Sequence, residues 1–269
     1  MSWLNLAEWN LALLLGAFGV VILGGIHTAR KGRLGRLRDL PSIAALEVAV
    51  GRATELGRPV FFIPGVRDLD DVQTVAGLSI LRSVAGMTAR HQCELYVPTD
   101  RSLVMNTARE ICREAYAEAG QADSFRQEMV DYVSDEQFAY AAKVDGLIAR
   151  ERPAACFLMG SFFAESLLLA EAGRQAGAVQ VAGTAGWHQL PFLVASCDYV
   201  LIGEELFAAS AYLTREPALL GTLRGQDLGK YLAMALLVAG SLFGALAILT
   251  SGSLPATLHQ VVLRLLQTR

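Results

Sequence analysis

Side chains that could do acid–base or binding chemistry stand in short polar segments, each directly after an apolar run. These segments contain Asp68, Asp100, Ser161, Thr184, His188, Glu204 and Glu205. Paired with Glu204 or Glu205, the imidazole of His188 could act as a general acid and base or bind a metal ion. No H-x-x-x-H or other ligand spacing supports a metal, however, and the chain has no nucleophile motif. We therefore expect a ligand-binding crevice at these seven residues and assign no catalytic residue, no metal site and no cofactor.

The same segments also have purely structural explanations. Carboxylates in the first turn of a helix stabilise it through the helix dipole, which would account for Glu165, Glu204 and Glu205. The sequence Gly-Thr-Ala-Gly at 183–186 can be a tight turn between a strand and a helix, and His188 can be a hydrogen-bonded structural histidine. Both readings stay open at this point.

The elements that must position these residues are short apolar runs alternating with longer helical patterns. The runs lie at 59–63, 94–98, 154–159, 179–183 and 199–203. Helical patterns occupy 42–56, 70–90, 102–119, 135–150 and 162–176, with Ser134 as the expected N-cap of the fourth. Such alternation predicts an α/β fold: a Rossmann-like parallel sheet of about five strands with helices on both faces. We expect the last run, Tyr199–Ile202, to be a central strand that is buried on both faces.

Ligands of such sheets lie beyond the carboxyl ends of the strands, where the polar segments stand. No strand is followed by GxGxxG or GxxxxGK[ST], so the phosphate-binding backbone of those motifs is missing. Carboxylates outnumber the two opposing cations of this edge, Arg67 and Arg101. The sequence therefore argues against a dinucleotide-binding role.

The composition narrows the class of protein further. Of 269 residues, 53% are hydrophobic and only 18% are charged, with a mean hydropathy of +0.39, which is too apolar for a typical soluble enzyme. A net charge of −3 provides no field for nucleic acid, which we exclude as a partner. The four cysteines are widely spaced, and we interpret them as reduced thiols.

Two uncharged runs, 11–26 and 231–250, have the character of membrane spans. The second has the length of a span by itself, and the first has it once residues 4–7 are added. A buried core helix is the alternative for the second run. A basic cluster follows the first run, and it consists of Arg30, Lys31, Arg33, Arg36 and Arg38. The tail before the first run has no Lys or Arg. This asymmetry of basic residues predicts a cell-membrane protein with two spans, a cytoplasmic central domain and both termini outside. The cluster can also bind anionic lipid headgroups.

We divide the chain accordingly into an N-terminal transmembrane anchor (1–29), a cytoplasmic α/β domain (30–228), a second transmembrane helix (229–251) and an amphipathic C-terminal tail (252–269). The tail places several leucine and valine side chains on one helical face.

Several longer stretches carry a family resemblance. They are residues 47–65, 74–81, 135–148, 162–173, 181–213 and 223–230. The chain resembles a prokaryotic membrane-anchored family that is catalogued only as a domain of unknown function. The resemblance implies a membrane-tethered α/β domain and brings no reaction with it.

Three functions compete on these grounds. The first is a noncatalytic membrane scaffold that forms a homo-oligomer and contacts lipids and other membrane subunits, since helical stretches such as 75–87 and 162–173 are apolar over most of their surface. The second is a membrane-tethered ligand-binding or hydrolytic enzyme that uses the acidic crevice around His188, Glu204 and Glu205. The third, transport, would require an oligomer, because two spans without an intramembrane charge form no pathway alone.

Overall fold

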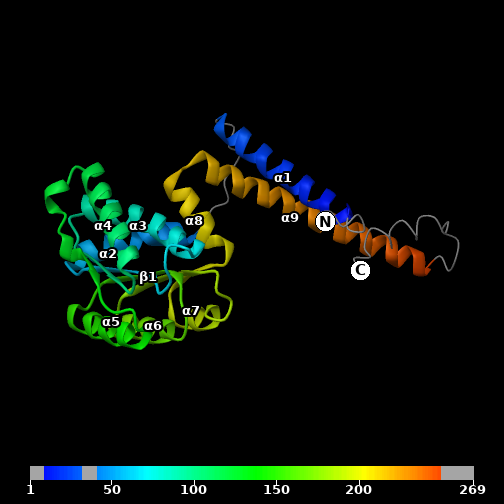
Figure 1. Cartoon of the computed structure of the whole chain (residues 1–269). Coiled ribbons are helices and arrows are strands. Elements are labelled where there is room, and N and C mark those ends of the chain that lie inside the picture. Colours follow the sequence, from blue (N-terminus) through cyan, green and yellow to red (C-terminus); the bar gives the residue numbers. More distant parts are fainter. Residues whose placement is uncertain (1–8, 32–40, 250–269) are drawn as a thin grey trace, which may run out of the picture. The chain divides into compact units, whose positions relative to one another are not determined.

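The structure is a computed structural model that describes residues 9–31 and 41–249 (Figure 1). The chain forms two compact units. One unit is Arg38–Arg215, and the other combines Met1–Leu37 with Glu216–Arg269.

The Arg38–Arg215 unit contains a six-stranded sheet in which every neighbouring pair is parallel. The strands are β1 Val60–Gly65, β2 Leu95–Thr99, β3 Val130–Tyr132, β4 Ala155–Ser161, β5 Val179–Thr184 and β6 Tyr199–Ile202. Their order in the sheet is β3-β2-β1-β4-β5-β6, the order of a doubly wound Rossmann-type fold. The α/β prediction is confirmed. The strand that it missed, β3, has three residues of which only Val130 is buried, so it carries too little apolar sequence to be recognised.

The prediction that the last strand is central was wrong. β6 lies at the edge of the sheet, where it pairs only with β5. Leu201 is buried, but Tyr199 and Ile202 are exposed. The physical reason is that the fold winds outward from β1 in two directions, so the last strand of the chain ends the second half of the sheet.

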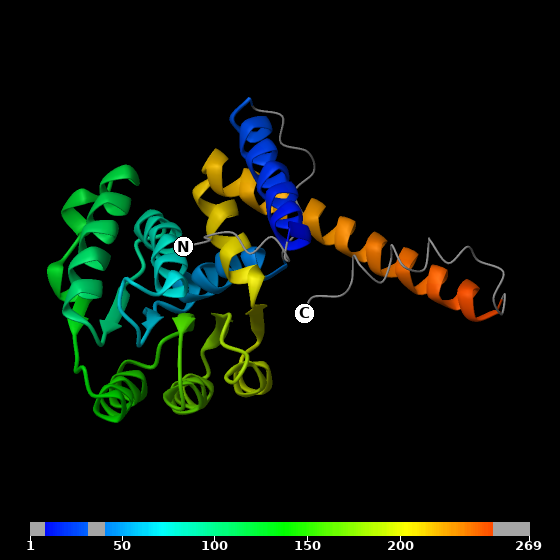
Figure 2. The same cartoon turned by 45° about the vertical axis from the view of Figure 1, so that its right-hand side comes forward.

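Helices cover both faces of this sheet (Figures 1 and 2). One layer consists of α2 Pro41–Leu56, α3 Val72–Arg90, α4 Ser102–Glu118 and α8 Glu204–Thr214; the other consists of α5 Gln137–Glu151, α6 Glu165–Gln175 and α7 Leu190–Ser196. Two short 3-10 helices, Ala122–Ser124 and Gln127–Met129, precede β3. Successive residues of β1 point to opposite layers, so Phe62 joins the core under α2–α4, and Phe61 and Ile63 join the core under α5–α7.

Helix α3 is buried over most of its length, because it packs between the sheet and its neighbouring helices. The apolar residues at 75–87 that suggested an external partner are therefore largely core residues. The helix begins at Asp71, whose side chain accepts a hydrogen bond from the backbone N–H of Gln73 at 2.8 Å.

Helix α5 begins later than the sequence suggested. Its N-cap is Glu136, which accepts hydrogen bonds from the backbone N–H groups of Phe138 and Ala139. Ser134 was the wrong choice of N-cap. Its hydroxyl oxygen instead accepts a hydrogen bond from the backbone N–H of Glu136, the N-cap residue, at 3.2 Å.

The second unit is a pair of antiparallel helices, α1 Trp9–Arg30 and α9 Pro217–Leu249. Glycines of α9 let the backbones approach closely. A Cβ atom on Gly225 would lie 2.8 Å from the Cα of Ile22, and one on Gly229 would strike the ring of Phe18. By contrast, a Cβ atom on Gly240 or Gly244 would meet nothing within 4 Å.

The two apolar runs are staggered along this helix pair. Phe18, in the middle of the first run, packs at Gly229, just before the second run begins at Tyr231. The middle of the second run, near Gly240, lies about 17 Å farther along α9 at 1.5 Å per residue.

Within the residues that the structure describes, no helix combines enough length with enough apolar character to cross a membrane. Arg33, Arg36, Arg38 and the tail 252–269 lie outside the described residues, as does Thr250, the last residue of the second apolar run.

Candidate functional site

The carboxyl ends of β1 and β4 are held together by backbone contacts. The N–H of Val66 donates to the carbonyl oxygen of Ser161 at 2.9 Å, beyond the end of β1. Gly65 has φ +90°, and a Cβ atom there would lie 2.5 Å from the same oxygen, so only glycine fits. In a doubly wound sheet, these two strands flank the switch point where ligands usually bind. The close contact brings the backbones together at that point.

Asp100, directly after β2, is the most unusual ionisable group of this edge. Its side chain is nearly inaccessible to solvent, and Oδ1 has no hydrogen-bond partner in the described part of the chain. Oδ2 lies 3.3 Å from Nε of Arg101. Burial raises the pKa of the Asp100 carboxyl from 3.8 to about 7; Arg101 opposes this rise, and the charges of Asp68 and Glu165 add to it.

Glu165 is a second buried carboxylate of the same edge, and its two oxygens are both occupied. Oε1 accepts from the backbone N–H of Phe163 at 2.7 Å, and Oε2 accepts from the side-chain amide of Gln137. These bonds tie the start of α6 to the start of α5. A role in fixing the two helix starts explains Glu165 without a ligand.

Tyr140 lies among these groups without direct access to solvent. Its hydroxyl donates to the carbonyl oxygen of Pro98 at 2.9 Å. Burial raises the pKa of this phenol well above its ordinary value, and the charges of Asp100 and Glu165 add to the effect. Tyr140 therefore stays neutral and links α5 to the end of β2.

The remaining predicted residues lie at other strands. Thr184 is buried and donates to the side-chain oxygen of Gln73 at 3.2 Å, while the ring of exposed His188 stacks on Trp187 with centroids 3.5 Å apart. Glu205 accepts from the backbone N–H of Ile202 at 3.1 Å. His188 and Glu205 thus have different immediate partners.

The strand order explains why the seven predicted residues do not form one site. β2, which precedes Asp100, and β6, which precedes Glu204 and Glu205, are separated by β1, β4 and β5. At about 4.8 Å per strand, this separation is about 19 Å. Asp68 and Asp100 come together with Glu165, whereas Thr184, His188, Glu204 and Glu205 belong to the β5–β6 side. Among the described residues, no group of three or more His, Cys, Asp or Glu side chains is placed to hold a metal ion.

Sequence reasoning missed Gln73, Gln137 and Tyr140. Each is a helix residue that hydrogen-bonds to another element, so its role depends on how the helices pack at the strand ends. No motif marks them, although Gln73 could have been noticed through its place in the first turn of α3, two residues after a capping Asp71.

Exposed apolar side chains lie next to this edge on α6 and α7, which pack side by side, and in the segments just before these two helices. We call this area the α6–α7 surface. It consists of Phe163, Leu167, Leu168, Trp187, Phe192 and Val194, which are between 43% and 72% exposed. The guanidinium of Arg67 lies 5.7 Å from the ring centroid of Phe163, at the border of this surface.

Fold and site together define a doubly wound α/β protein. At its switch point the backbones of β1 and β4 are in contact, and the carboxylates of Asp100 and Glu165 are buried nearby. The chain belongs to the family described as a domain of unknown function (DUF6754), whose model matches residues 1–254. No curated protein and no solved structure matches the chain significantly. Membership of a family described only as a domain of unknown function is thereby confirmed, and it brings no assigned reaction with it.

Proposed function

We propose that the chain is a noncatalytic, membrane-anchored assembly subunit that forms a homo-oligomer through its α/β domain and its helices α1 and α9. The observation that carries this proposal is the α6–α7 surface. Six large apolar side chains, each about half exposed or more, present an area on the order of 500 Å². The largest apolar patch of a typical monomer covers about 300–600 Å² and is often functional. These side chains would supply more than half of the roughly 800 Å² that each partner of a standard interface buries.

The helix pair supports membrane anchoring. Exposed apolar side chains surround the later part of α9, and they are Tyr231, Leu232, Met234, Leu236, Leu237, Val238 and Leu242. A helix that is apolar on all sides requires lipid or protein around it. Because α1 and α9 are antiparallel, both termini would be on one side of the membrane, and Arg30 and Lys31 would meet lipid headgroups on the cytoplasmic side.

The stagger of α1 and α9 supports contacts between copies along the later part of α9. Phe18 and Ile22 pack near the start of α9, so the later part of α9 extends past them, with Gly240 and Gly244 open to close approach. Small residues of this kind let helices pack tightly in lipid. Helices of a second copy would cover this part of α9.

Two matched variants of the full-length chain test the proposal, each adding a charge to an exposed apolar position. Leu168→Glu alters the α6–α7 surface, and Val48→Glu alters the opposite layer of helices, on α2. We expect the parent and Val48→Glu to be oligomers in mild detergent, and Leu168→Glu to shift toward smaller species by light scattering and by cross-linking in membranes. A parent that is monomeric in both settings, or equal behaviour of the two variants, would contradict the proposal.

A second candidate function is a membrane-tethered ligand-binding or hydrolytic enzyme at the carboxyl edge. The observation that favours it is Asp100, a buried carboxyl with an unpartnered oxygen and a pKa near neutrality, as a general acid or base requires. A small molecule that copurifies with the parent and is lost from Asp100→Asn, with the oligomer unchanged, would favour this function.

A further inference from the structure

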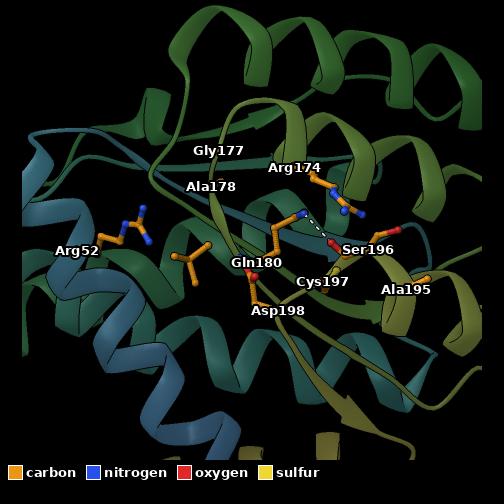
Figure 3. Close-up of a pocket in the computed structure, with 10 residues that line it drawn as sticks. Arg52, Arg174, Gly177, Ala178, Gln180, Ala195, Ser196, Cys197 and Asp198 are labelled. Atoms are coloured by element: carbon orange, nitrogen blue, oxygen red, sulfur yellow. Dashed lines mark hydrogen bonds between the residues drawn. The ribbon is translucent and has the colours of Figure 1, made fainter.

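A pocket lies at the amino ends of β5 and β6, at the edge of the sheet away from the carboxylates described above. Its volume is about 390 Å³, and Arg52, Arg174, Gln180, Ser196, Cys197 and Asp198 are among the residues that line it. Figure 3 shows Arg52 of α2 and Arg174 of α6 on opposite sides, with Gln180 and Asp198 between them. Pockets that bind small molecules have volumes of roughly 300–1,000 Å³.

The two arginines of the pocket are unpaired. Neither Arg52 nor Arg174 has an ion-pair or hydrogen-bond partner among residues 9–31 and 41–249. Arg58, two residues before the start of β1, shows the contrast. Its guanidinium donates to the main-chain oxygens of Arg152, Pro153 and Ala176. Arg58 thus has a structural role, whereas the guanidinium groups of Arg52 and Arg174 keep all their donors available.

The floor of the pocket is fixed by Gln180, which is buried. Its side-chain amide donates to the carbonyl oxygen of Ala170 at 2.9 Å. It also donates to the carbonyl oxygen of Ser196 at 3.2 Å, as Figure 3 shows. Its side-chain oxygen has no hydrogen-bond partner in the described residues. Gly173 makes room for this side chain, since a Cβ atom there would lie 2.5 Å from that oxygen.

The one carboxylate of the lining, Asp198, is already engaged. Its Oδ2 accepts from the backbone N–H of Gln180 at 2.8 Å, and the Asp198 N–H donates back to the Gln180 carbonyl oxygen at 3.0 Å. Burial raises the pKa of the neighbouring Cys197 thiol to about 12, so this group adds no negative charge. Two free cations therefore face one occupied carboxylate.

We infer that this pocket binds the phosphate group of a phosphate monoester, held from both sides by Arg52 and Arg174. The planar guanidinium matches phosphate oxygens in a bidentate arrangement, and two such groups with no protein anion to satisfy them favour an anionic ligand. The phosphate could belong to a small metabolite or to the headgroup of a phosphatidic acid. This inference is independent of the proposed assembly function, since the pocket residues Arg52 and Arg174 are outside the α6–α7 surface.

The test uses the full-length chain in an uncharged detergent and in phosphate-free buffer. Calorimetric titration with glycerol phosphate represents the metabolite, and mixed micelles with phosphatidic acid, compared with phosphatidylcholine, represent the lipid. We expect Arg52→Gln and Arg174→Gln each to weaken binding of one of these probes at least about tenfold, as loss of a charged hydrogen bond implies. Arg174→Lys, which keeps the charge and loses the planar fork, should lie between the parent and Arg174→Gln.

Arg90→Gln is the matched control, because Arg90 is exposed on α3 and lies outside the pocket. Its binding should equal that of the parent at the same ionic strength. Pocket-dependent binding of glycerol phosphate identifies a metabolite, and pocket-dependent binding of phosphatidic acid alone identifies a lipid. If neither probe binds, or if Arg90→Gln weakens binding as much as the pocket variants, the inference is wrong.

Discussion

The side-chain oxygen of Gln73 accepts two hydrogen bonds from the far side of the switch point, from the Thr184 hydroxyl at 3.2 Å and from the backbone N–H of Ala185 at 2.6 Å. The first turn of α3 is thereby connected to the end of β5, 111 residues later in the chain. The amide side chain of Gln73 thus fixes the position of Thr184 and Ala185 relative to α3.

Replacement of Gln73 by leucine should therefore destabilise the α/β domain. The partly buried N–H of Ala185 and the hydroxyl of Thr184 would lose their acceptor, at a cost of about 1–3 kcal/mol in the free energy of unfolding. Denaturant unfolding measures the loss. Gln175→Leu is the control, because the amide of Gln175 donates to Glu171 on the exposed side of the same helix. Equal stability of the two variants would show that the Gln73 contacts contribute nothing.

Asp100 should make the domain less stable as the pH rises toward neutrality. Its pKa is about 7 in the folded chain and near 3.8 when unfolded, so between these values the folded state binds more protons. The stability from the neutral carboxyl is fully present below the unfolded pKa and is lost as pH rises through the folded pKa. Arg101 partly compensates the charge of the ionised Asp100 carboxylate. The free energy of unfolding should therefore fall by on the order of 2–4 kcal/mol over this pH range.

Unfolding of the parent and of Asp100→Asn at about pH 5 and about pH 8 checks this expectation. The variant cannot ionise at this position, so its stability should change less between the two pH values. Asp131→Asn, at an exposed position of β3, should follow the parent. A slope that is the same in Asp100→Asn and in the parent would mean that Asp100 ionises without penalty.

Gly225 should be essential for the packing of α1 on α9. A leucine side chain there would push the backbone of Ile22 away, since even a Cβ atom would lie 2.8 Å from its Cα. Hydrogen exchange of α1 amides should accelerate in Gly225→Leu. In Gly240→Leu, where the added side chain meets nothing within 4 Å, exchange of α1 should remain that of the parent. Slow exchange in both variants would argue against the observed helix pair.

The proposed topology can be checked by labelling single cysteines in a cysteine-free background. A membrane-impermeant reagent applied to intact cells should modify Ser2→Cys and Ser253→Cys and should miss Ser124→Cys. The basic residues after the first apolar run motivate this pattern. If Ser124→Cys were labelled from outside and the other two positions were protected, the orientation in the membrane would be the opposite of the proposed one.

The edge position of β6 predicts different tolerances at neighbouring residues. Leu201→Asp should cost several kcal/mol, about the whole stability of many domains, because it places an unpaired charge in the core. Ile202→Asp should cost less than about 1 kcal/mol, because the Ile202 side chain is half exposed. Similar melting temperatures for the two variants would show that the burial pattern of β6 is wrong.

Five strands could be predicted because their apolar runs are long and are separated by helical patterns. β3 could not, since Val-Asp-Tyr buries one residue and its pairing with β2 is a tertiary contact. Strand order is not encoded in hydrophobic alternation, which is why Tyr199–Ile202 was placed in the centre. The site shows the same division. Asp100 follows a strand and was recognised, whereas Tyr140 acquires its role only when α5 packs against the end of β2.

The place of β1 at the middle of the sheet also affects how the domain is made. Val60 pairs with Leu95 on one side and with Ala155 on the other, so one edge of β1 finds its partner long before the second. During synthesis, the β1–β3 half can form while the Val-Phe-Phe-Ile edge of β1 stays open. Open apolar strand edges are sites of aggregation and of chaperone binding. Pausing of translation between Tyr132 and Ser161 should therefore increase aggregation of the newly made chain, whereas pausing after Thr184, once β4 and β5 can pair, should matter much less.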